Sequence, residues 1–207
     1  LNNIIRKLHQ RQDVCILSES TSNIYGDHII SCIDRTLERI YGRPEFLPEL
    51  VITIGNSIIS KKLKKLFRKY NPVEHWHIED TSRAQDVFSS LTAFLPIEPK
   101  NFLKQLTSHV ENKKEENEFQ KLWKKEDLIA SKNHAVFEKS CIWSDLKAHY
   151  ILQKYLNHNF IIQMGNSTSV RYIQLFDTKK NLSYFGNRGI SGIEGSTSTA
   201  LGSASVH

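Results

Sequence analysis

The apolar positions in the first half of the chain follow two different periods. Three short runs rich in β-branched and aromatic side chains predict strands, and they occupy residues 14–18, 49–55 and 74–80. Between them, apolar residues recur every three or four positions, which predicts helices over residues 27–40 and 61–70. Strands that alternate with helices of this length indicate βαβ units and a parallel sheet.

Narrow apolar stripes define these helices. The side chains that set the period are Ile29, Ile33, Leu37 and Ile40 in the first helix, and Leu63, Leu66, Phe67 and Tyr70 in the second. Asp27 is interpreted as the cap of the first helix. Pro99 suits the first turn of a further helix, so we expect the first domain to end near residue 108.

A charged connecting segment follows, over residues 109–127. Within it, Phe119, Leu122 and Trp123 supply a narrow apolar stripe. We interpret the segment as a linker that becomes a helix, docked on the rest of the chain by these three side chains. This interpretation is favoured over a binding site.

The alternation of elements resumes after the linker. Ser144 suits the N-cap of a helix over residues 143–156. Further patterns predict a buried strand over 159–165, a strand with its exit loop over 182–189, and a helix entered from 191–205.

These elements together predict an α/β protein. We expect a Rossmann-like parallel-sheet central domain over residues 1–108, a charged linker and helix over 109–130, and the beginning of a second α/β domain over 131–207. Hydrophobic residues make up 39% of the 207 and charged residues 24%, which is compatible with an ordinary packed core.

Composition narrows the class of protein. No apolar run reaches the roughly 18 residues that a membrane helix needs, so no membrane span is expected. The three cysteines are scattered, odd in number and without a C-x-x-C pair, which favours free thiols and a cytoplasmic location. The net charge of +6 suggests nucleic acid, but the basic cluster at 61–70 is explained by the polar face of an amphipathic helix. We therefore expect no nucleic-acid partner.

Two loops follow predicted strands of the second half, where open α/β sheets bind their ligands. Their residues are Gly165, Asn166, Ser167 and Arg171 in the first loop, and Asn187, Arg188, Gly189, Gly192 and Gly195 in the second. Glycine lets backbone approach a ligand, and arginine matches carboxylate or phosphate. Two arginines on neighbouring loops suit a substrate with more than one carboxylate. A plain turn with surface arginines is the alternative.

Other candidate sites are weaker. The glycine spacing of the second loop differs from the dinucleotide fingerprint and from a P-loop. His75 and His77 lie on one face of a predicted strand, but the local sequence offers no third ligand, so a structural pair is favoured over a metal site. No metal ligand is predicted in the chain.

The two loops also resemble a known family. "GNSTSVR" followed by "GNRGISGIEGSTSTALG" is similar to loops of the MenD family, the thiamine-diphosphate-dependent 2-succinyl-5-enolpyruvyl-6-hydroxy-3-cyclohexene-1-carboxylate synthases of menaquinone biosynthesis. Residues 50–70 and 75–80 resemble the family's central domain, and the resemblance spans most of residues 10–207. Ile190 and Glu194 stand where the family usually has alanine and aspartate.

The resemblance implies a fold and a reaction. The second domain would be the start of the thiamine-diphosphate-binding α/β domain. The reaction would decarboxylate 2-oxoglutarate and add the succinyl carbanion equivalent to isochorismate, with thiamine diphosphate and Mg²⁺, or Mn²⁺, as cofactors. The full-length protein would be a cytoplasmic homodimer or homotetramer.

The resemblance also implies residue roles. Ser167 and Arg171 would contact substrate or intermediate, and Arg188 would hold a carboxylate. Ile193 would be the apolar wedge that bends the cofactor beneath its thiazolium ring. The residues that would shape the cofactor pocket by close backbone approach are Asn166, Gly189 and Gly192.

The same resemblance places essential parts outside the chain. The family's magnesium motif would begin just past His207, and its activating glutamate lies in an N-terminal domain. The chain is therefore expected to be an internal fragment without synthase activity of its own. The alternative is a non-catalytic α/β module that binds small anions or a protein partner, which would lack a Gly-Asp pair shortly beyond residue 207.

Overall fold

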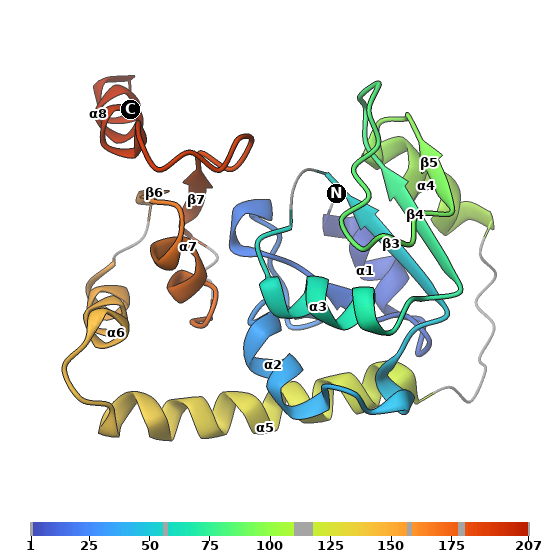
Figure 1. The fold of residues 1–207 in the computed structure, drawn as a ribbon, viewed down its shortest axis with the longest axis horizontal. Coiled ribbons are helices and arrows are strands. Elements are labelled where there is room, and N and C mark those ends of the chain that lie inside the picture. The colour runs from blue at the N-terminus through green and yellow to red at the C-terminus, as the bar shows by residue number, and fades with distance from the viewer. Residues whose placement is uncertain (1, 56–57, 110–117, 157–158, 178–180, 207) are drawn as a thin grey trace.

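The computed structural model describes residues 2–55, 58–109, 118–156, 159–177 and 181–206, which form helices and parallel sheets (Figure 1). The helices are α1 (Asn2–His9), α2 (Ile33–Ile40), α3 (Lys61–Lys69), α4 (Pro99–His109), α5 (Phe119–Ser140), α6 (Asp145–Tyr155), α7 (Thr168–Ile173) and α8 (Ser196–Val206), with short 3-10 turns η1 (Ser20–Ser22) and η2 (Pro44–Phe46). The strands are β1 (Ile16–Leu17), β2 (Ile29–Ile30), β3 (Leu50–Ile54), β4 (Glu74–Ile78), β5 (Ala93–Leu95), β6 (Ile161–Met164) and β7 (Ser183–Gly186). The predicted α/β class is confirmed.

The central sheet has the order β3–β4–β5, with both pairings parallel. Its two faces are covered by different helices. Val51 faces the cluster that contains α3, whereas Ile52, the next residue, packs against the cluster formed by α1 and α4. Burial on both faces explains why β3, with the sequence LVITI, reads as a nearly continuous apolar run.

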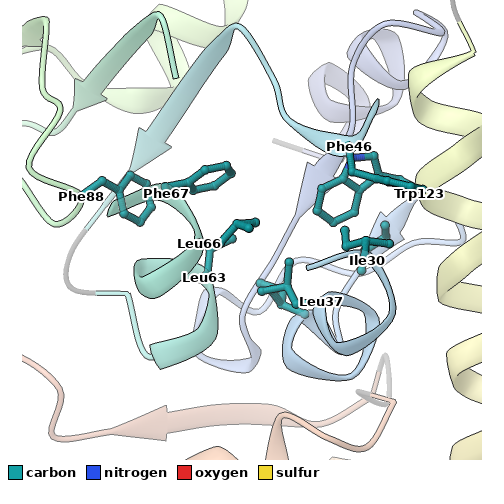
Figure 2. Close-up of a cluster of buried hydrophobic side chains, with 10 residues drawn as sticks. Ile30, Leu37, Phe46, Leu63, Leu66, Phe67, Phe88 and Trp123 are labelled. Carbon is teal, nitrogen blue, oxygen red and sulfur yellow. The ribbon is translucent and has the colours of Figure 1, made fainter. Parts of the chain in front are cut away.

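Helix α5 joins the two halves of the molecule (Figure 1). Figure 2 shows Trp123 of α5 beside Phe46 and near Ile30 and Leu37 of the first half. Phe119 and Leu122 pack against the same cluster, so the predicted apolar stripe docks this helix. Residues 110–117 of the predicted linker lie outside the described part of the chain.

The segment before α2 differs from its predicted form. A helix was expected from residue 27, but Ile29 and Ile30 form β2, which pairs in parallel with β1. The helix begins only at Ile33, and its N-cap residue is Cys32, so Asp27 does not cap it. Two adjacent β-branched residues favour an extended backbone once a neighbouring strand can pair with them.

The second half is built on the parallel pair β6–β7. Met164 and Tyr184 are buried there, and Ile59, which precedes α3 in the first half, is buried in the same cluster. The strand over 159–165 was expected to be buried, yet only Met164 of β6 is buried and the other residues of β6 are partly exposed. The pair has no third strand among the described residues.

In the described part of the chain, no helix combines the length and the apolar composition that crossing a bilayer requires. The three cysteines are free thiols, as expected. Burial raises the pKa of Cys15 to about 12 and raises the pKa of Cys32 as well. Both thiols therefore stay protonated near neutral pH.

His75 and His77 belong to a buried polar chain on the central sheet. Thr53 Oγ1 lies 3.0 Å from Nε2 of His75 and 2.9 Å from Nδ1 of His77. Nε2 of His77 lies 3.3 Å from Oε2 of Glu79. Both rings are buried, at 0% and 2% exposure, so these hydrogen bonds satisfy polar atoms inside the sheet.

Acid is expected to destabilise the fold through His75. Burial lowers the pKa of this ring below its ordinary value of 6.5, and His77 lowers it further, whereas Asp86 opposes the shift. Below that ordinary value the unfolded chain binds more protons than the folded chain, so falling pH favours unfolding. Between pH 7 and pH 5, roughly the range around the ordinary pKa of histidine, the imidazole of the unfolded chain becomes charged. Over this range the His75→Phe variant should lose less stability than the wild type, as measured by thermal unfolding. Equal losses in the two proteins would exclude His75 as a cause.

Candidate functional site

The two predicted loops leave the same end of the β6–β7 pair. In the parallel register Met164 lies opposite Gly186, the last residue of each strand. The loops therefore start side by side at the carboxyl edge of this sheet, the edge at which α/β proteins bind ligands.

Side-chain hydrogen bonds tie the loops together. Asn166 donates from Nδ2 to the carbonyl oxygen of Asn187 at 2.9 Å and to the carbonyl oxygen of Gly192. Arg188 donates from Nη1 to Oδ1 of Asn166 at 2.9 Å. Asn166 thus uses both ends of its amide to hold the second loop against the first, and the two loops form one unit.

Ser167 has an unusual backbone conformation. Its φ of 65° and ψ of −117° lie outside the regions that residues other than glycine normally adopt. The residue immediately precedes α7, but its side chain makes no capping hydrogen bond, and it is exposed. Strain of this kind is found preferentially at functional sites, which supports the choice of Ser167 as a candidate.

Arg171 lies on α7 with a partly buried side chain. Its Nε is buried and has no hydrogen-bond partner among the residues that the structure describes. A buried donor left without a partner is costly, and the cost disappears if a ligand oxygen accepts from it.

The two arginines share a neighbourhood with the basic face of α3. Burial lowers the pKa of Lys64, the Glu19 carboxylate opposes this, and the positive charges of Arg188, Arg68 and Arg171 lower it further. We call Lys64, Arg68, Arg171 and Arg188 the basic cluster. A separate, open hollow of about 610 Å³ lies along α3, and all of its lining residues belong to that helix: Lys61, Lys64, Lys65, Arg68 and Lys69. Converging positive charge in a hollow attracts anions.

The glycine residues of the second loop leave open space beside its backbone. A Cβ added at Gly189 would meet no atom within 4 Å, and one added at Gly192 would make only ordinary contact with Ile190. Gly195 alone of the three needs glycine for its conformation, with φ of +83°. Ile193 is 82% exposed, so this apolar side chain is available for contact with a bound group.

Sequence reasoning missed the contribution of α3. Its lysines were assigned to a solvated face, but Lys64 is half-buried, donates from Nζ to the carbonyl oxygen of Ile58 at 2.8 Å, and borders the arginines. The period of the helix separates buried from exposed faces, yet it carries no information about other segments of the chain that pack nearby. Among the described residues, no group of three or more His, Cys, Asp or Glu side chains is placed to hold a metal ion.

Comparison with known proteins identifies relatives under one name. No family model matches the chain. The 2-succinyl-5-enolpyruvyl-6-hydroxy-3-cyclohexene-1-carboxylate synthase of Flavobacterium johnsoniae is 37% identical over 97% of the chain, and that of Flavobacterium psychrophilum is 36% identical over 97%. The synthase of Porphyromonas gingivalis is 35% identical over 95% of the chain.

In each of these comparisons the chain spans only 36% of the relative's length. The similarity covers both the central sheet and the two interlocked loops, because almost the whole chain is aligned. The chain therefore belongs to the family of 2-succinyl-5-enolpyruvyl-6-hydroxy-3-cyclohexene-1-carboxylate synthases and corresponds to about a third of a member's length.

Proposed function

We propose that the full-length protein is a thiamine-diphosphate-dependent synthase of menaquinone biosynthesis. It decarboxylates 2-oxoglutarate and adds the resulting succinyl unit to isochorismate. The observation that carries the proposal is the pair of arginine-bearing loops, interlocked through Asn166, whose guanidinium groups lie near Lys64 of α3. Both substrates carry two carboxylates, and a guanidinium group recognises a carboxylate well through paired hydrogen bonds.

The second loop has the properties that a bulky cofactor requires. Space beside Gly189 is open, and the exposed Ile193 offers an apolar contact. When bound, thiamine diphosphate supplies the carbanion chemistry through which a 2-oxo acid loses carbon dioxide. In this proposal Ile193 supports the cofactor ring, while Asn166, Gly189 and Gly192 shape its pocket.

The described residues account for the cofactor ring but not for a metal ion. Mg²⁺, or Mn²⁺, would accompany the diphosphate, but the described residues offer no cluster of metal ligands. We therefore assign no metal ligand to this chain and derive no step from the ion.

The chain's own residues bind and orient the substrates. Arg188 holds one carboxylate, and the unpartnered Nε of Arg171 donates to substrate or intermediate. Ser167, whose exposed side chain lies at the N-terminal end of α7, directs a hydroxyl toward the same substrate. Fixed donors of this kind stabilise developing negative charge without reorganising during the reaction.

This function assigns roles to the segments of the chain. Residues 1–108 form the central domain, 109–130 the linker and helix, and 131–207 the first part of the diphosphate-binding domain. The full-length protein assembles as a homodimer or homotetramer in this proposal.

Steady-state turnover of the full-length protein tests the function. With thiamine diphosphate and Mg²⁺ present, 2-oxoglutarate and isochorismate should be consumed together with release of carbon dioxide. Omission of the cofactor or of isochorismate should stop product formation. A full-length protein that binds thiamine diphosphate but leaves both substrates unchanged would refute the proposal.

A further inference from the structure

The loop between β1 and β2 reaches across to the second half of the molecule. It contains η1, which lies against β7. Two polar side chains at the ends of this turn, Glu19 and Asn23, make its contacts with distant backbone.

Asn23 pairs with the backbone of Tyr184 in both directions. Its Nδ2 donates to the carbonyl oxygen of Tyr184 at 3.0 Å, and the Tyr184 N–H donates to Oδ1 of Asn23 at 2.7 Å. A side-chain amide has the donor and acceptor of a peptide group, so Asn23 pairs with the edge of β7 as a residue of a neighbouring strand would. The hydroxyl of Tyr25 extends this contact by donating to the carbonyl oxygen of Leu182 at 2.8 Å.

The backbone of Asn23 is suited to this role. Its φ of 52° and ψ of 35° are left-handed, a conformation that asparagine adopts more readily than most residues. At the other end of the turn, the Glu19 carboxylate accepts from the N–H groups of Ile59 at 2.8 Å and Ser60 at 2.7 Å. The side chain of Ile59 is buried with Tyr184, so both ends of the turn are anchored beside β7.

The strand held in this way leads directly into the arginine loop. β6 occupies one edge of β7, and Asn23 satisfies the backbone groups of Tyr184 on the other. The strand ends at Gly186, and Arg188 follows two residues later. Any movement of β7 therefore moves the guanidinium that contacts Asn166.

We infer that Asn23 is a positioning residue, which fixes the Arg188 loop by pairing with the backbone of Tyr184. Its effect on substrate rests on the proposed function, whereas its effect on the loop does not. Asn23 itself lies in the first half of the chain and needs no contact with substrate.

Asn23→Gly separates the amide from the backbone conformation, because glycine tolerates the left-handed region. In the full-length protein, hydrogen exchange in peptides spanning 182–186 should accelerate about tenfold or more, as the loss of two hydrogen bonds implies. Hydrogen exchange in peptides spanning 186–192 should also accelerate. The KM for 2-oxoglutarate should rise by a larger factor than kcat changes. Asn23→Asp, which keeps the acceptor but loses the donor, should fall between the wild type and Asn23→Gly.

Ser89→Gly is the matched control, since Ser89 is an exposed residue of the first half with φ of 59°. It should leave exchange in 182–192 and KM as in the wild type. Unchanged exchange in 186–192 of Asn23→Gly would overturn the inference, and so would faster exchange with an unchanged KM in an active enzyme. If the wild type itself has no synthase activity, the proposed function fails, and exchange in 186–192 decides the positioning role alone.

Discussion

Replacing Trp123 by alanine is expected to lower the free energy of unfolding by about 3–5 kcal/mol, the usual cost of truncating a buried tryptophan. The side chain is 2% exposed and packs edge-on against Phe46 and Phe119, with ring centroids 6.0 Å and 6.2 Å apart. Its loss leaves a cavity between α5 and the first half that rigid neighbours cannot fill. Because α5 also leads to the second half, loosening it should disturb both parts of the chain.

Urea unfolding followed by circular dichroism measures this change without relying on tryptophan fluorescence. Leu128→Ala on the same helix is the control, because Leu128 is 56% exposed and its truncation should cost less than about 0.5 kcal/mol. Similar losses in the two variants would show that Trp123 does not anchor α5.

Replacing Arg188 by alanine in the full-length protein should lower kcat/KM. The expected decrease corresponds to a loss of about 1.5–3 kcal/mol of transition-state stabilisation, the value of a hydrogen bond to a charged group. The same change removes the donor to Oδ1 of Asn166 and so loosens the contact between the loops. Arg188→Lys should recover only part of the loss, because a lysine cannot reproduce the two-pronged guanidinium.

The control for this experiment is Arg83→Ala, which removes an equal charge from an exposed position in the first half. Its kinetics should match the wild type at the same ionic strength. If Arg188→Ala also keeps wild-type kinetics, Arg188 is not part of the substrate site.

Local pattern was enough to locate the main helices and central strands. The period of Leu63, Leu66 and Phe67 predicted α3, and all three side chains are buried. Ser144 caps α6 as predicted, accepting from the N–H of Lys147 at 3.3 Å. Apolar period and caps are local properties of the sequence, so single elements of this kind can be recognised without knowledge of their neighbours.

Short strands could not be predicted in this way, because pairing with a neighbouring strand determines whether they form. β2 has only two residues and depends on pairing with β1, and β5 has only three. Ile29 fits a helical period equally well, so the sequence offers no local reason to prefer the strand.

The site itself was only partly predictable. Loops bearing Arg171 and Arg188 could be recognised from glycine and arginine after apolar runs, and the structure brings these loops together. The approach of Lys64 to the two arginines and the pairing of Asn23 with β7 both join positions more than 100 residues apart in the sequence. Asn23 and Tyr184, for example, are separated by 161 residues. Such contacts arise from packing between halves of the chain, for which no local pattern exists.

The most direct test is a calorimetric titration of 2-oxoglutarate into the full-length protein with thiamine diphosphate and Mg²⁺, for the wild type, Arg171→Ala, Arg188→Ala and the double variant. We expect each single change to weaken binding about tenfold or more. The double variant should lose less than the sum of the two, because both guanidiniums act on one bound anion. Wild-type affinity in either single variant would contradict a shared carboxylate site on the two loops.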